Sequence, residues 1–254
     1  MSKRIMILPD TQIPLHNRKA LKKVIEFIGE YQPDEVVHIG DLMDYPQPSR
    51  WSKDTRAEFE GSVFKDSEMA KEHLLAPLRE VYSGPVGVIE GNHDERPRQY
   101  LKKYAPALAE SRAFHMDTLL DFDKYEIQWL PDFYELAPGW VATHGHKGGI
   151  RLTQDSGKTA LNAAVRFGKS VIMGHTHRLA ALPKSFGYDA NINTVWGVEV
   201  GNLMDMRQAQ YLKGATANWQ SGFVILQVDK GRVTPVVVPI VDRAFTVDGK
   251  TYTI

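Results

Sequence analysis

Residues 171–177 read Val-Ile-Met-Gly-His-Thr-His, an apolar strand that runs directly into two histidines one residue apart. Four other apolar runs end in the same way, with a carboxylate, an amide or an imidazole. The five runs and the polar residues after them are residues 5–8 with Asp10, residues 36–39 with Asp41 and Asp44, Val86–Ile89 with Asn92 and His93, Trp140–Thr143 with His144 and His146, and residues 171–173 with His175 and His177. Open α/β sheets bind ligands at the carboxyl ends of their strands. The pattern therefore predicts an α/β fold with a metal site at one sheet edge.

Composition narrows the classes of protein to consider. The 254 residues suffice for one large domain or two small ones with a substantial core. Basic and acidic residues balance at 31 each, so no overall field attracts nucleic acid or an anionic membrane. The absence of cysteine excludes disulfides and thiolate-bound zinc and fits a reducing compartment. No apolar run has the length of a transmembrane helix or the form of a signal peptide, so we expect a soluble cytoplasmic protein without membrane contact.

The first third of the chain alternates strand and helix. Apolar residues at helical spacing over residues 21–31 predict a helix between the first two strands, which makes a βαβ unit. The long polar segment over about 45–83 is predicted to be a helical insertion, with one helix over about 55–81. Its first residues, 45–51, are rich in aromatic residues and proline, and we expect them to shape access to the site.

The rest of the chain is predicted to contain more strand. A helical stretch over 95–122 is expected to be broken at Pro97 and Pro106, and another helix is expected over 160–167. Short strands over 126–143, separated by proline-containing turns, suggest hairpins. After His177 the β-branched residues concentrate over 194–200, 223–228 and 233–240, and Asp229-Lys230-Gly231 is predicted to be a hairpin turn. No repeat or linker interrupts the sequence, so we predict a single domain over 1–254 with a β-rich C-terminal part over about 190–254.

The donor types narrow the chemistry. Oxygen and imidazole donors without sulfur suit Mn²⁺, Fe or Zn²⁺ and make Cu(I) or an iron–sulfur cluster a poor fit. The candidate ligands are Asp10, Asp41, Asn92, His144, His175 and His177. They are too many for one ion. Two ions that share a bridging carboxylate would activate a bridging water as nucleophile and clamp phosphoryl oxygens, while a nearby imidazole protonates the leaving alkoxide.

The order of these motifs resembles the calcineurin-like metallophosphoesterases over roughly residues 5–200. The resemblance implies a four-layer α/β/β/α sandwich in which Asp41 bridges two divalent metal ions. It implies further that the first ion is completed by Asp10 and His177, and the second by Asn92, His144 and His175. His93 would contact the scissile phosphate and the leaving group, with Asp44 orienting its ring.

The first motif departs from the usual Asp-x-His, because Gln12 stands where the family carries histidine. An amide oxygen binds a divalent metal more weakly than imidazole, so Gln12 is expected to be a weak ligand of the first ion. Glutamine here resembles a branch of Mn²⁺-dependent diphosphatases that act on ADP-ribose-like and CDP-alcohol substrates. The resemblance therefore implies Mn²⁺, with Fe, Zn²⁺, Ni²⁺ or Co²⁺ as alternatives. Tyr45, in place of the arginine of Ser/Thr protein phosphatases, argues against a phosphoprotein substrate.

Several residues have an alternative interpretation. Each strand-end aspartate or asparagine alone is often a turn or helix cap, and His146 competes with His144 as ligand, with His144 preferred because it comes first after the strand. A basic and aromatic cluster is either a nucleic-acid contact or a solvated helix face; it comprises Arg96, Arg98, Tyr100, Lys102, Lys103 and Tyr104. Tyr45 and Trp51 either stack a base or are buried. The remaining histidines are expected to pack or to face solvent, namely His16, His38, His73 and His115.

We therefore expect a phosphoesterase that hydrolyses a phosphodiester or diphosphate bond in a nucleotide or nucleic acid. A metal-bridging hydroxide attacks, and His93 is the general acid. A phosphomonoesterase is the enzymatic alternative, and a non-catalytic interaction module with the same fold is the alternative of another class. The physiological substrate and the oligomeric state are open at this point.

Overall fold

A computed structural model describes residues 2–208 and 217–254 of the chain. The first of its two large sheets contains the N-terminal strands. The order of the sheet is β11-β10-β1-β2-β3-β4, formed by Arg232–Pro239, Gly222–Asp229, Lys3–Leu8, Glu35–His38, Val86–Ile89 and Ile127–Leu130. Strands β1 to β4 run parallel to one another, and β10 is antiparallel to β1. The carboxyl ends of β1, β2 and β3 consequently lie at one edge of the sheet.

The second sheet has the order β5-β6-β7-β9-β8, formed by Tyr134–Ala137, Trp140–Thr143, Ser170–Met173, Asn191–Val200 and Leu179–Tyr188. Strands β6, β7 and β9 are parallel, and β5 and β8 are antiparallel to their neighbours. A separate two-stranded sheet pairs β12 (Ala244–Val247) with β13 (Lys250–Thr253). The carboxyl ends of β6 and β7 lie together in the same way as those of β1 to β3.

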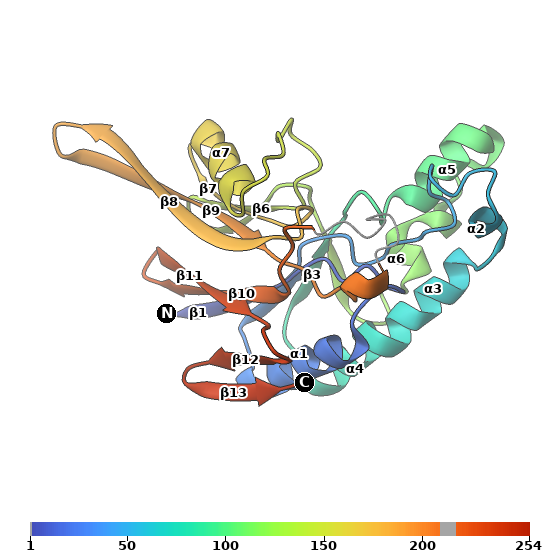
Figure 1. Ribbon diagram of the computed structural model, residues 1–254, viewed down its shortest axis with the longest axis horizontal. Helices are drawn as coiled ribbons and strands as arrows, with labels where there is room; N and C mark the ends of the chain where they lie inside the picture. Colours follow the sequence, from blue (N-terminus) through green and yellow to red (C-terminus); the bar gives the residue numbers. More distant parts are fainter. Residues whose placement is uncertain (1, 209–216) are drawn as a thin grey trace.

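The two large sheets pack face to face, and helices cover their outer faces (Figure 1). Buried apolar side chains from both sheets fill the space between them, among them Ile7, Ile39, Ala142, Ile172 and Val198. Helix α1 (Arg18–Tyr31) covers the first sheet and α7 (Lys158–Phe167) covers the second. The order is helix, sheet, sheet, helix, which confirms the predicted four-layer α/β/β/α sandwich.

Helix α1 forms where the apolar spacing predicted it. Its buried side chains include Leu21, Val24 and Ile28, which repeat every three or four residues and face the core. The side chain of Asn17 accepts a hydrogen bond from the backbone N–H of Ala20 and caps the first turn. Among the described residues, no helix is both long and apolar enough to cross a membrane.

The helix predicted over 55–81 is wrong as a single element. The segment contains α2 (Arg56–Phe59), α3 (Val63–Ala70), a π-helical turn (Lys71–Leu75) and α4 (Ala76–Val81). The break between α2 and α3 falls at Gly61, whose φ of +108° lies outside the helical region, and Ser62 then caps α3. The helical stretch after β3 also differs from the prediction, because Pro97 lies in the first turn of α5 (Arg96–Tyr104). A proline there starts a helix instead of breaking it.

Two strand pairings differ from the sequence-based expectation. Only β5 and β6 form a hairpin within residues 126–143, because β4 pairs with β3 in the first sheet and the chain then crosses to the second. Strand β8 was not predicted, since Pro183 and Gly187 are poor strand residues. It pairs with β9 in a long hairpin that projects beyond the rest of the molecule (Figure 1). The predicted turn at Asp229-Lys230-Gly231 is confirmed as the connection between β10 and β11.

Candidate metal centre

The polar residues that follow the strands converge where the two sheets meet. Asp10 follows β1 and Asp41 follows β2, while His144 comes directly after β6 and His175 follows β7. Glycines make this close approach feasible. A Cβ added at Gly174 would lie 2.4 Å from Asp10 Oδ1, and one at Gly40 would lie 2.7 Å from His144 Nδ1. Any side chain in place of glycine would displace Asp10 at the first position or His144 at the second.

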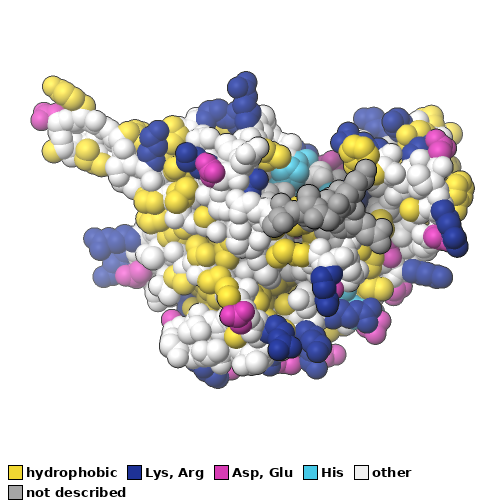
Figure 2. Space-filling view, in the orientation of Figure 1, with side chains coloured by type: hydrophobic (Ala, Val, Ile, Leu, Met, Phe, Trp, Pro, Cys, Tyr) yellow, Lys and Arg dark blue, Asp and Glu magenta, His cyan; other side chains and the backbone are white. Residues whose placement is uncertain are grey.

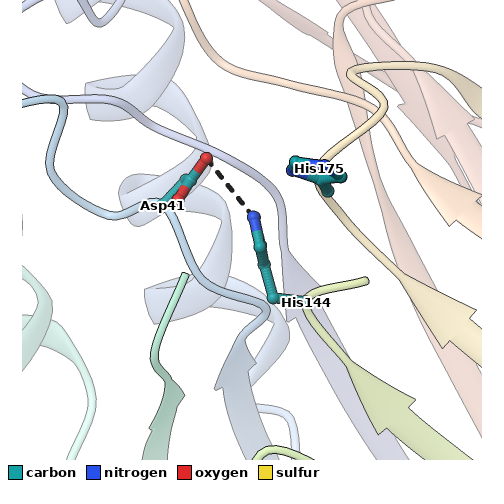
Figure 3. A group of neighbouring side chains, drawn as sticks. All are labelled: Asp41, His144 and His175. Carbon is teal, nitrogen blue, oxygen red and sulfur yellow. Dashed lines mark ion pairs between the residues drawn. The ribbon is translucent and has the colours of Figure 1, made fainter. Parts of the chain in front are cut away.

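One donor group consists of Asp41, His144 and His175, each offering a ligand atom within 4.8 Å of the others. Figure 3 shows Asp41 and His144 pointing toward each other, with His175 beside them from another loop. The Nδ1–H of His144 donates to the carbonyl oxygen of Ile39 at 3.1 Å, because that oxygen can only accept. The other ring nitrogen, Nε2, lies 3.3 Å from Asp41 Oδ2 and 3.1 Å from the side-chain oxygen of Asn92. Asn92 thus extends this group as the sequence predicted.

A second donor group consists of Asp10, Asp41 and His177, again with ligand atoms within 4.8 Å of one another. His177 Nε2 lies 3.2 Å from Asp10 Oδ2. The carboxylate of Asp10 also accepts the backbone N–H of His175, which ties the first strand end to the histidine loop. Asp41 belongs to both groups. The structure therefore brings together six predicted ligands as two groups that share one carboxylate.

Gln12 lies beside the second group. Its side chain is buried, and its Nε2 is 3.0 Å from His177 Nε2. The amide oxygen, Oε1, is buried and has no hydrogen-bond partner among the described residues. The two ends of an amide exchange by a half rotation, which would turn this oxygen toward the group. Gln12 is accordingly in place to act as a ligand.

Burial and charge set the protonation of the first group. Burial opposes ionisation of Asp41, but the imidazoles of His144 and His93 outweigh it and hold the Asp41 pKa well below its usual range. Burial likewise opposes a charge on His144, yet Asp41 raises the His144 pKa to about 9. Burial and the neighbouring His144 lower the pKa of His175 to about 4. An ionised Asp41 carboxylate and a neutral His175 imidazole therefore face one small volume.

These residues fit divalent metal ions on chemical grounds. Asp10 and Asp41 are carboxylates with at most 1 % of their surface exposed, and bound cations stabilise carboxylates that are buried side by side. The Gln12 side-chain oxygen accepts no hydrogen bond from the described residues, so it is free to act as a further metal ligand. Oxygen and imidazole donors suit Mn²⁺, Fe or Zn²⁺. The arrangement can hold two such ions with Asp41 between them.

His93 lies at the border of the first group. Its Nδ1 is 2.7 Å from Asp44 Oδ1, and its backbone N–H donates to Asp41 Oδ1 at 2.8 Å. Its Nε2 is 3.9 Å from Asp41 Oδ2 and therefore faces the donor groups. Arg96, which the sequence analysis placed only in a basic cluster, donates from Nη2 to this same Nε2 at 3.1 Å. His93 lies in the turn just before α5, and the backbone N–H of Arg96 donates to the carbonyl of His93 at 3.1 Å, so the separation of three residues across this turn was the available signal.

The structure places several residues for which the sequence left alternatives open. His146 stands outside both donor groups, and its Nε2 lies 3.8 Å from Glu95 Oε1. Tyr45 is buried and its hydroxyl pairs with Ser67 at 2.8 Å, so it does not stack a base. Trp51 is 75 % exposed. His38 is buried and its Nε2 contacts Thr11 Oγ1, so it packs beneath the site.

Two supporting residues were missed by sequence analysis. Glu199 is fully buried in β9, where Oε1 accepts the backbone N–H of Thr159 at the start of α7 and Oε2 accepts the hydroxyl of Thr176 at 2.9 Å. Asn202 donates to the backbone carbonyl of His177 at 3.1 Å. A carboxylate between Val198 and Val200 in an apolar strand was the available signal for Glu199. Nothing in the sequence around Asn202 marks it.

Comparisons with known proteins agree with the motif pattern. The sequence pattern of the family described as calcineurin-like phosphoesterase matches residues 3–179. The Gene 54 proteins of Mycobacterium phages L5 and D29 are each 59 % identical over 253 residues, which covers 99 % of this chain and 99 % of each relative.

Solved structures with a similar course of the chain include Vps29 from Entamoeba histolytica complexed with zinc, at 14 % identity and a TM-score of 0.49 over 96 % of both chains. Another is the phosphoesterase YfcE from E. coli, at 12 % identity and a TM-score of 0.42 over 92 % of this chain and 98 % of that one. These scores are too low to support an inference about activity.

Proposed function

The chain belongs to the calcineurin-like phosphoesterase family, and from that premise we propose that it is a dinuclear metal-dependent phosphoesterase. The proposed reaction is hydrolysis of a phosphodiester or diphosphate bond in a nucleotide or nucleic acid. The observation that carries the proposal is the membership of Asp41 in both donor groups. A carboxylate shared in this way suits two ions about 4 Å apart, the separation found in two-metal hydrolases.

The ligands divide into two sets around Asp41. Asp10, Gln12 and His177 would hold the first ion, and Asn92, His144 and His175 the second. We propose Mn²⁺ as the native metal, because the set contains oxygen and imidazole donors and no sulfur. When bound, the two ions would activate a water as nucleophile and neutralise charge on the phosphoryl oxygens.

His93 is proposed as the general acid. The hydrogen bond from its backbone N–H to Asp41 Oδ1 fixes the backbone of His93. The contact between Nδ1 and the Asp44 carboxylate fixes the orientation of the ring. These contacts leave Nε2 facing the donor groups, where the leaving oxygen of a bound ester would take up a proton. Asp44 is then a positioning residue, since it acts through His93 and not on the substrate.

The first test combines metal content with activity. We expect about two Mn²⁺ per chain in the wild-type protein. Asp41→Asn should lose bound metal and lower the rate more than about 100-fold, because an amide cannot bridge two cations as a carboxylate does. Lys22→Ala, an exposed change on α1, is the control and should leave both values unchanged. Less than one ion per chain together with no hydrolysis of any phosphate ester would favour a non-catalytic interaction module.

The second test separates the bond types. Initial rates with Mn²⁺ on 4-nitrophenyl phosphate and bis(4-nitrophenyl) phosphate compare a monoester and a diester with the same leaving phenol. We expect the diester to react faster, and a strong preference for the monoester would replace this proposal by a phosphomonoesterase.

The role of His93 needs a substrate whose leaving group requires a proton. His93→Ala should lower the rate about 100-fold or more on the dinucleotide TpT, which releases a basic alkoxide, and much less on the nitrophenyl diester. Equal losses on both substrates would exclude His93 as the acid.

A further inference from the structure

Arg96, the first residue of α5, reaches from the helix into the candidate site. Its Nη1 donates to the backbone carbonyl of Asp44 at 2.5 Å and to Asp44 Oδ1 at 3.2 Å, and its Nη2 donates to His93 Nε2 at 3.1 Å. The side chain is 19 % exposed. One imidazole nitrogen therefore separates the guanidinium from the carboxylate shared by both donor groups.

The contact with His93 places Arg96 where a substrate must go. A guanidinium only donates, so Nε2 of His93 is the acceptor and Nδ1 the donor to Asp44. The edge of His93 that faces the donor groups is thus covered by Arg96 in this conformation. A substrate that approaches this edge must displace Nη2 from it, and Nε2 is then free to take up the proton that the proposed acid role of His93 requires.

Arg96 would exchange its contact with His93 Nε2 for one with the substrate, and this exchange is favourable when the substrate group is anionic. Arginine stays charged at all physiological pH values, and its planar fork binds phosphate oxygens through strong charge-assisted hydrogen bonds. A neutral imidazole nitrogen is the weaker acceptor. The bond from Nη1 to the Asp44 carbonyl can persist during the exchange and keep the guanidinium at the site. The Nε–H is a further donor that a second phosphate oxygen can accept.

The position of Arg96 also indicates which part of the substrate it contacts. Arg96 Nη2 and Asp41 Oδ2 both approach His93 Nε2, at 3.1 Å and 3.9 Å, so the guanidinium lies at the ring nitrogen that faces the metal-ligand groups. Because His93 is proposed to protonate the leaving oxygen from Nε2, a group at this nitrogen contacts the leaving group. This step depends on the proposed function.

We propose that Arg96 determines specificity by binding a phosphate on the leaving group, so that the site selects diphosphates over diesters with an uncharged leaving group. In the reaction, the water oxygen forms a new P–O bond, the P–O bond to the leaving phosphate breaks, and the products are two phosphate monoesters. The preferred substrate class is accordingly nucleoside diphosphate derivatives. Arg96 holds the departing phosphate as its negative charge increases.

The kinetic test uses ADP-ribose, whose leaving group carries a phosphate, and TpT, whose leaving group does not. Arg96→Ala should lower kcat/KM on ADP-ribose about 10- to 100-fold, and only a few-fold on TpT, because one charge-assisted hydrogen-bonded contact is lost. Arg96→Lys keeps the charge without the fork and should recover part of the loss. Lys22→Ala removes an exposed charge from α1, outside the basic and aromatic cluster, and should leave the ratio of the two substrates unchanged. Thermal unfolding of each variant shows whether it is folded.

A binding test measures the contact between Arg96 and a second phosphate without turnover. Calorimetry with Mn²⁺-loaded protein compares α,β-methylene-ADP, which carries two phosphates and is not cleaved at the bridge, with AMP, which carries one. Arg96→Ala should weaken binding of the methylene compound about 10-fold or more and leave AMP nearly unchanged.

Three outcomes would overturn the role of Arg96. They are equal losses on ADP-ribose and TpT, cleavage of TpT but not of ADP-ribose by the wild-type protein, and equal changes in affinity for AMP and the methylene compound. Failure of the proposed function itself is distinguishable, because the wild-type protein would then hydrolyse neither substrate. The calorimetric comparison would still report on Arg96.

Discussion

Two buried carboxylates of this protein have opposite environments. Asp41 faces the imidazoles of His144 and His93, which hold its pKa well below the usual range despite burial. Asp66, in α3 of the insertion, is 7 % exposed, and burial raises its pKa to about 6. Its Oδ2 has no hydrogen-bond partner among the described residues. A carboxylate that keeps its charge is useful as a ligand, whereas the charge of Asp66 is a cost to the fold.

Because the buried charge of Asp66 destabilises the fold, Asp66→Asn should raise the free energy of unfolding by an amount that depends on pH. The pKa of about 6 lies above the unfolded value of 3.8, so the folded state binds more protons and loses stability as pH rises from about 4 to 6. The amide has no charge to bury. The free energy of unfolding should therefore be higher than wild type by about 3 kcal/mol at pH 8 and by less than about 1 kcal/mol at pH 4.

Urea denaturation of both proteins at the two pH values measures this difference. Asp54→Asn is the matched control, because Asp54 lies in the same insertion with its side chain 85 % exposed and should show no such pH dependence. A gain of the same size at pH 4 and pH 8 would mean that the charge of Asp66 is not responsible.

At the scale of elements, helix α7 and the histidine loop are held by one side chain. Glu199 in β9 accepts two backbone N–H groups from the first turn of α7, as anions do at helix N-termini, and it also accepts the Thr176 hydroxyl. Thr176 lies between His175 and His177. The loop that carries both histidines is thus held by a β9 side chain, Glu199, that lies 23 residues beyond Thr176 in the chain.

Thr176→Val removes the hydroxyl and keeps the shape of the side chain. We expect a loss of about 10- to 100-fold in Mn²⁺ affinity, as for other residues that orient metal ligands, while α7 keeps its contact with Glu199. Metal titration gives the affinity and circular dichroism gives the helix content. Glu199→Ala should reduce both metal affinity and the free energy of unfolding, since it also removes the acceptor at the start of α7. Unchanged metal affinity in Thr176→Val would rule out this positioning role.

The elements also show what sequence can and cannot predict. Asp10, Asp41 and His144 follow apolar runs directly, so the end of a strand and the ligand type are both local features of the sequence. Glu199 and Asn202 contact the histidine loop only because β9 pairs with β7, and no local pattern encodes that pairing. The same holds for β8, whose proline and glycine oppose a strand while its long pairing with β9 outweighs them.

At the scale of the whole molecule, the donor groups connect the two sheets. Asp10, Asp41 and Asn92 follow strands of the first sheet, and His144, His175 and His177 follow strands of the second. Figure 2 shows histidine side chains at the surface on the upper part of the molecule. The sheets are also held together by apolar side chains between them and by the hydrogen bond from the Tyr134 hydroxyl to Glu35 Oε1. Metal ions bound to both sets would therefore crosslink the two halves of the sandwich.

This crosslink predicts that metal stabilises the entire fold. At a free Mn²⁺ concentration of about 100 times Kd, one site adds about 2.7 kcal/mol to the free energy of unfolding, which raises Tm by roughly 5 to 10 °C in a chain of this size. Adding EDTA should reverse the shift. Asp41→Asn, which lacks the shared carboxylate, should show less than half of the wild-type shift at the same Mn²⁺ concentration, while Lys22→Ala should behave as wild type. Since the ligands come from both sheets, unfolding should remain a single transition with and without metal. A metal-dependent rise confined to one of two separate transitions would show that the ions stabilise only one sheet.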